Sequence, residues 1–66
     1  MIVDRTKIDT LLAEKQMTHV MLSKETGISR QSISTILKRK TCEPKTAGKL
    51  AAGLGVPVSE ILAREA

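Results

Sequence analysis

The sequence predicts an all-α domain built from five short helices. Apolar residues recur at helical spacing, as in Ile8, Leu11 and Leu12, while no run alternates β-branched and polar residues long enough for a strand. The 66 residues include no Phe, Tyr or Trp, so the core must be aliphatic, which suits closely packed helices. A chain of this length forms one domain, residues 1–66.

The first helix is predicted to begin at a capping residue near the amino end. Asp4 or Thr6 can accept hydrogen bonds from the first free amides, and the helix then runs to about Lys15. Gln16 follows, where Gly is the usual residue. It therefore either adopts a left-handed backbone at some cost or marks a different loop geometry.

A helix-turn-helix is predicted at the centre of the chain, at about residues 18–38. Thr18 caps a helix that ends at Gly27, where Gly provides a left-handed turn, and Ser29 caps the next helix, which extends to about Lys40. Ser23 is a small inward residue that allows the two helices to approach closely.

Two more helices are predicted after a short loop. Pro44 suits the first position of a helix that runs to Leu54. Gly48 and Gly53 each weaken this helix by up to about 1 kcal/mol relative to Ala, so both are expected where a neighbouring backbone approaches closely. Ser59 can cap a short fifth helix.

The net charge of +4 is concentrated in the third predicted helix and the loop after it. Cations and anions balance in residues 1–28 and again in 46–66. Residues 29–45 carry the whole excess, as Arg30, Lys38, Arg39, Lys40 and Lys45 against Glu43 alone. A basic stripe predicts a polyanionic partner. RNA is disfavoured because no aromatic side chain is present to stack on bases.

The third predicted helix has two different faces. Ile33, Ile36 and Leu37 share one side. The opposite arc carries polar side chains of moderate length, namely Arg30, Gln31, Ser34, Thr35 and Lys38. Such donors and acceptors suit base edges in a DNA groove, with the following cations beside the phosphates. The alternative is an ordinary solvated face whose basic last turn matches the helix dipole.

The ordered segments 18–33, 46–56 and 59–62 together resemble the Cro/C1-type helix-turn-helix family, which includes lambda-type phage repressors and xenobiotic-response-element regulators. The resemblance covers about residues 3–63 and implies a five-helix, lambda-repressor-like DNA-binding domain. By position, it implies base-reading roles for Ser29, Arg30, Gln31, Ser34 and Thr35. It implies phosphate contacts for Thr18, His19, Lys38, Arg39, Lys40 and Lys45.

The sequence departs from the family pattern at three places. His19 stands where Gln is common; a neutral imidazole can still donate to a phosphate, or His19 is an exposed polar residue without a special role. Leu12 and Leu37 replace an Arg–Glu pair of many relatives and are expected to touch. Val20 and Met21 occupy a usually polar face, and are expected to extend the core rather than form a patch for a protein partner.

The resemblance implies a sequence-specific regulator that binds double-stranded DNA, most simply a repressor from a bacterium, a phage or another mobile element. A single small domain rarely gives useful specificity, so we expect a homodimer on a palindromic operator. Pro57, Val58 and Ile61 are candidates for the dimer surface, or else they complete the core of a monomer.

The other functional class is an antitoxin or anti-repressor module of the same fold, whose main partner is a protein. An enzyme is not expected, because one His, one Cys and no paired carboxylates at helical spacing leave no catalytic constellation. One Cys also excludes an intramolecular disulfide and a structural zinc site. No cofactor, metal, small-molecule ligand or membrane contact is expected, and the location is expected to be cytoplasmic, in association with the nucleoid.

Overall fold

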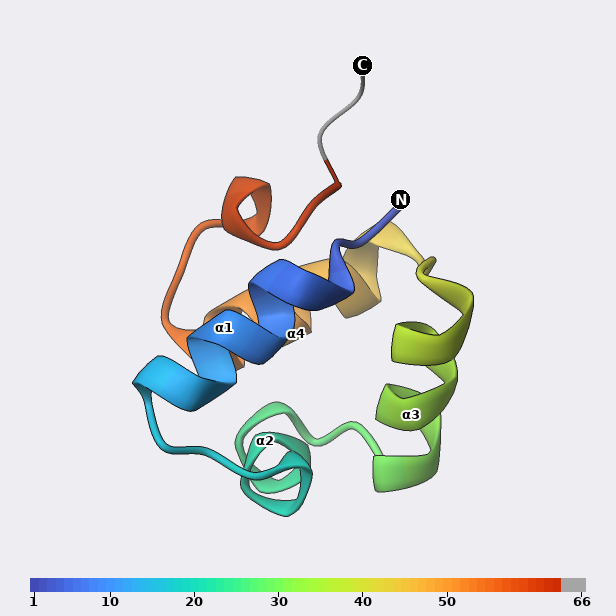
Figure 1. Cartoon of the computed structure of the whole chain (residues 1–66). Coiled ribbons are helices and arrows are strands. Elements are labelled where there is room, and N and C mark those ends of the chain that lie inside the picture. The colour runs from blue at the N-terminus through green and yellow to red at the C-terminus, as the bar shows by residue number, and fades with distance from the viewer. Residues whose placement is uncertain (64–66) are drawn as a thin grey trace.

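The computed structural model describes residues 1–63, which contain four α-helices and one short 3-10 turn (Figure 1). The elements are α1 (Arg5–Glu14), α2 (His19–Thr26), α3 (Arg30–Arg39), α4 (Pro44–Leu54) and η1 (Val58–Glu60). α2 packs against both α3 and α4, and α4 packs against η1. Within this described part, no helix has the length and apolar character that a membrane span requires.

Side chains cap the first three helices at their amino ends. Asp4 accepts a hydrogen bond from the Lys7 amide, so Asp4 rather than Thr6 caps α1. The hydroxyls of Thr18 and Ser29 accept the corresponding bonds at α2 and α3, as the sequence predicts. α4 begins instead with Pro44, whose missing N–H would have had no helical partner at that position.

The carboxyl ends of the four helices use two kinds of residue. Gly27 and Gly55 adopt left-handed backbones after α2 and α4, with φ of 73° and 71°. Gln16 and Lys40 adopt the same region after α1 and α3, with φ of 53° and 61°, although both carry a Cβ. Of the two alternatives that the sequence leaves open for Gln16, the left-handed backbone is therefore the correct one. Lys40 carries a similar strain.

One aliphatic core joins all five elements. Its buried members are Val3, Ile8, Leu12, Leu22, Ile33, Ile36, Leu37, Ala47, Leu50, Ala51, Leu54 and Ile61. Leu12 and Leu37, which the sequence predicts to touch, both belong to this core. Ile61 is 0% exposed, which makes it a core residue and removes it from any dimer surface on the folded chain.

The predicted fifth helix is wrong. Ser59 lies inside the 3-10 turn Val58–Glu60 and does not cap a helix. The physical reason is that the chain after the turn forms backbone hydrogen bonds with residues 2–4 instead of continuing as a helix. The Ile61 carbonyl accepts a hydrogen bond from the Asp4 amide at 2.8 Å, and the Ala63 amide donates to the Ile2 carbonyl at 3.0 Å.

The two glycines of α4 differ in their surroundings. A Cβ added to Gly53 would collide with the Cγ2 methyl of Thr26, so α2 approaches α4 closely at this position, through a side chain rather than through the predicted backbone. A Cβ added to Gly48 would meet nothing within 4 Å, so the predicted close approach at Gly48 is wrong. Only Gly53 is required for the packing of the helix-turn-helix on α4.

The segment at residues 1–4 lies between two distant parts of the chain. Isolated antiparallel bridges pair Ile2 with Thr41 and Val3 with Leu62. In Figure 1 the amino end accordingly lies beside the yellow loop that follows α3. No sequence pattern predicts this arrangement, because two isolated bridges are too short to show strand periodicity.

Candidate nucleic-acid interface

The two faces of α3 are separated as its periodicity predicts. Ile33, Ile36 and Leu37 are buried in the core. All five predicted base-reading residues are exposed, namely Ser29, Arg30, Gln31, Ser34 and Thr35. In Figure 1, α3 lies at one side of the molecule. The structure thus brings the five residues together at the start and second turn of one helix.

The polar side chains on this face differ in their internal bonds. The Ser29 hydroxyl caps the helix by accepting from the Ser32 amide at 3.1 Å, and the Thr35 hydroxyl donates to the Gln31 carbonyl at 2.9 Å. Within residues 1–63, the side chains of Arg30, Gln31 and Ser34 make no hydrogen bond or ion pair. These three therefore retain their hydrogen-bonding capacity for an external partner.

The turn between α2 and α3 is fixed by side chains of α2. The Ser23 hydroxyl donates to the Ile28 carbonyl at 2.6 Å. The Thr26 hydroxyl donates to the Leu22 carbonyl at 2.8 Å and accepts from the Ile28 amide at 3.2 Å. Together with the left-handed Gly27, these bonds set the orientation of α3 relative to α2. The sequence does not predict this role of Thr26, although a Thr directly before a Gly turn is a usable signal.

The predicted phosphate-contacting residues occupy two separate places. Thr18 is exposed and His19 half-buried at the amino end of α2, where the helix dipole favours an anion. The other four are exposed at the end of α3 and the start of α4, namely Lys38, Arg39, Lys40 and Lys45. The ion pair within residues 1–63 joins Arg5 to Asp9 at 3.5 Å, so the four cations form no ion pair with an anion in that range.

Val20 and Met21 do not extend the core, contrary to the preferred prediction. Val20 is 39% exposed and Met21 46% exposed on the outer side of α2. They point outward because the inward position of this short helix is filled by Leu22. Met21 lines a groove of about 260 Å³ together with Met17, Lys24, Glu25 and Gly53.

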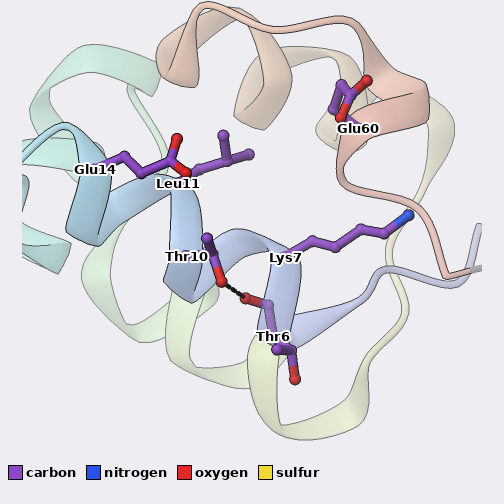
Figure 2. Close-up of a pocket in the computed structure, with 6 residues that line it drawn as sticks. All are labelled: Thr6, Lys7, Thr10, Leu11, Glu14 and Glu60. Carbon is purple, nitrogen blue, oxygen red and sulfur yellow. Dashed lines mark hydrogen bonds between the residues drawn. The ribbon is translucent and has the colours of Figure 1, made fainter.

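A second groove of about 290 Å³ lies between α1 and η1 (Figure 2). Leu11 provides apolar surface in it, and the carboxylates of Glu14 and Glu60 line it. Two of its other polar side chains are already engaged: the Thr10 hydroxyl donates to the Thr6 carbonyl at 2.8 Å, as Figure 2 shows, and Lys7 Nζ donates to the Leu62 carbonyl at 3.2 Å. The acidic lining makes this groove unsuitable for a nucleic acid.

The remaining candidate residues lie away from α3. Pro57 is exposed and Val58 is half-buried at η1, so both keep some apolar surface. Cys42 is half-buried in the loop after α3, and its burial raises the pKa of the thiol above the ordinary value of 9.0, although the positive amino terminus acts in the opposite direction. The thiol is therefore protonated near neutral pH.

A protein-family model described as the Cro/C1-type HTH DNA-binding domain matches residues 7–66. The match spans nearly the whole chain, including α2, the Gly27 turn and α3, and it confirms the resemblance drawn from the sequence. No curated protein and no solved structure is similar enough to the chain to match it.

Proposed function

Because the chain belongs to the family of the Cro/C1-type HTH DNA-binding domain, we propose that it is a transcriptional repressor, of bacterial or mobile-element origin, that binds a palindromic operator as a homodimer. The observation that carries the proposal is the exposed face of α3, where Arg30, Gln31 and Ser34 have no internal partner among residues 1–63. Its site of action would be the nucleoid in the cytoplasm.

The α3 face supplies side chains for direct readout in the major groove. The guanidinium of Arg30 can donate two parallel hydrogen bonds to guanine, and the amide of Gln31 can bond adenine as both donor and acceptor. Each such pair contributes about 1–3 kcal/mol of discrimination against the wrong base. Thr35, one turn further along, offers a methyl and a hydroxyl to a neighbouring base pair.

Two sets of residues would hold the duplex backbone on either side of α3. Thr18 and His19 at the amino end of α2 would approach one phosphate strand. Lys38–Lys40 and Lys45 would approach the other strand, where they displace condensed counterions. These contacts set the affinity and the register, whereas the α3 side chains set the sequence preference.

Dimerisation would use the surface at η1. Pro57 and Val58 expose apolar atoms, and the groove between α1 and Glu60 of η1 adds the apolar surface of Leu11. A two-fold contact there would place two α3 helices on half-sites about one helical turn apart, roughly 34 Å. Occupation of the operator by the dimer would then exclude the polymerase.

Selection from a pool of random-sequence duplexes tests the proposal, because the protein itself picks its operator from the pool. We expect enrichment of a palindrome with half-sites about 10 base pairs apart. Sedimentation of the protein with the enriched duplex should give two chains per duplex. Failure to enrich any sequence would contradict sequence-specific binding, and one chain per duplex would contradict the dimer.

The exposed pair Val20 and Met21 favours a second candidate, an antitoxin or anti-repressor module with a protein partner. The substitutions Val20→Glu and Met21→Glu together would abolish such a contact. If this candidate is correct, the double substitution would change the expression of a reporter gene in the host. The affinity of the purified protein for the enriched duplex would stay the same. An unchanged reporter would remove this candidate.

A further inference from the structure

The backbone of residues 1–3 is hydrogen-bonded to the loop that follows α3. The Met1 nitrogen donates to the Cys42 carbonyl at 2.7 Å, and the Cys42 amide donates back to the Met1 carbonyl at 3.0 Å. The Val3 amide donates to the Lys40 carbonyl at 3.0 Å. The Thr41 hydroxyl adds a bond to the Met1 carbonyl at 3.2 Å. Every residue from Lys40 to Cys42 is thus tied to the amino-terminal segment.

The same segment is anchored on its other side to the core. Val3 is buried, and the Asp4 amide donates to the Ile61 carbonyl at 2.8 Å. Ile2, in contrast, is 60% exposed, and Met1 is also exposed. Because Ile2 is mostly exposed and Met1 is only partly buried, these two residues hold the loop chiefly through their backbone hydrogen bonds.

The loop held in this way lies in the middle of the predicted phosphate contacts. Lys38 and Arg39 precede it, Lys40 belongs to it, and Lys45 follows it in the first turn of α4. Lys40 has a left-handed backbone at φ 61°, which is unfavourable for a residue that carries a Cβ. The bond from the Val3 amide to the Lys40 carbonyl is the tertiary contact at this position.

We propose that residues 1–3 are a positioning segment for the cationic loop, fixing the backbone of Lys40–Cys42 so that Lys38–Lys40 and Lys45 meet the phosphates in one arrangement. The proposal rests on the proposed function, since it concerns contacts to the same duplex. A loop ordered before binding loses less conformational entropy when it contacts the phosphates. The segment itself touches neither bases nor phosphates in this role.

Deletion of Ile2 tests the proposal, because it shortens the segment by one residue and should move Met1 out of hydrogen-bonding distance of Cys42. The matched control is Ile2→Met, which places the same residue before Val3 in a segment of full length. Both proteins retain Val3 and every cation. Affinity for the enriched operator duplex is measured by fluorescence anisotropy between about 50 and 200 mM salt, the range over which phosphate contacts dominate the change.

The deletion is expected to weaken operator binding about fivefold at physiological salt and to reduce the magnitude of the salt slope by about one unit, the contribution of one phosphate contact. The preference for operator over unrelated duplex should stay the same, and Ile2→Met should match the wild type. A salt slope equal to that of the control, measured on folded protein, would overturn the proposal even if the deletion lowered the melting temperature.

Amide hydrogen exchange of the wild type gives a test that does not depend on the folding of the deletion variant. The Cys42 amide should exchange more slowly than in an unstructured peptide, since it donates to Met1. Exchange at the unstructured rate would overturn the proposal. Wild-type binding that is absent or insensitive to salt would instead overturn the proposed function, and this proposal with it.

Discussion

The Ser23 hydroxyl donates a hydrogen bond of 2.6 Å to the Ile28 carbonyl, across the turn that joins α2 to α3. The bond spans the left-handed Gly27 and connects the inner side of α2 to the residue just before the cap of α3. Its consequence is that the exposed face of α3, which we propose reads DNA, is oriented by a side chain that lies off that face. A change at Ser23 therefore acts on stability and on the position of α3 together.

Ser23→Ala is expected to lower the free energy of unfolding by about 1–2 kcal/mol, because the half-buried Ile28 carbonyl loses a donor. Ser34→Ala is the matched control, since Ser34 is exposed on α3 and its side chain makes no hydrogen bond within residues 1–63. It should change the stability by less than about 0.5 kcal/mol. Urea denaturation followed by circular dichroism measures both; equal effects would contradict the role given to Ser23.

Gly53→Ala and Gly48→Ala should shift stability in opposite directions. Gly48→Ala should stabilise α4 by up to about 1 kcal/mol, because the added methyl enters open space. Gly53→Ala should destabilise the fold by about 1–2 kcal/mol, because the added methyl collides with Thr26. Thermal unfolding of the two variants measures the difference.

Thr26→Ser provides the rescue for Gly53→Ala. It removes the Cγ2 methyl that causes the collision and keeps the hydroxyl that bonds Leu22 and Ile28. The double variant should therefore be more stable than Gly53→Ala alone. Additive effects in the double-mutant cycle would show that the two positions are independent and would contradict the close packing of Gly53 on Thr26.

The helix boundaries were predictable because their signals are local. Thr18, Gly27, Ser29 and Pro44 each act within one turn of the helix that they start or end, so the sequence alone identifies them. The inward face of α3 was predictable for a similar reason, since periodicity within one helix determines which residues share a side.

The errors all concern contacts between residues far apart in the chain. The pairing of Ile2 and Asp4 with the chain after η1 replaces the predicted fifth helix and encloses Ile61. Nothing in the residue types at these positions indicates which backbone will meet which. The exposure of Val20 and Met21 likewise depends on how α2 packs against α3 and α4, which no single-helix pattern determines.

Gln16→Gly and Lys40→Gly should both stabilise the protein, by about 0.5–1 kcal/mol, because each residue has a left-handed backbone that Gly adopts without a Cβ penalty. Only Lys40→Gly should also weaken binding to a duplex and reduce the salt slope by about one unit, since it removes a cation beside the proposed phosphate path. Denaturation and anisotropy on the same samples separate the two effects. Equal DNA affinity for both variants would contradict a phosphate contact at Lys40.

The proposed reading role of α3 is tested most directly by comparing two variants, the double variant Arg30→Ala, Gln31→Ala and the single variant Lys45→Ala. Their affinities are measured for the enriched operator and for its single-base variants, over a range of salt concentrations. The double variant should lose about 2–6 kcal/mol of binding free energy for the operator, about 1–3 kcal/mol for each side chain. It should also lose its sequence preference at the contacted base pairs. Lys45→Ala should weaken binding to all duplexes alike, with a salt slope smaller by about one unit. Binding that is insensitive to salt, or an unchanged sequence preference in the double variant, would contradict the claim that α3 reads DNA.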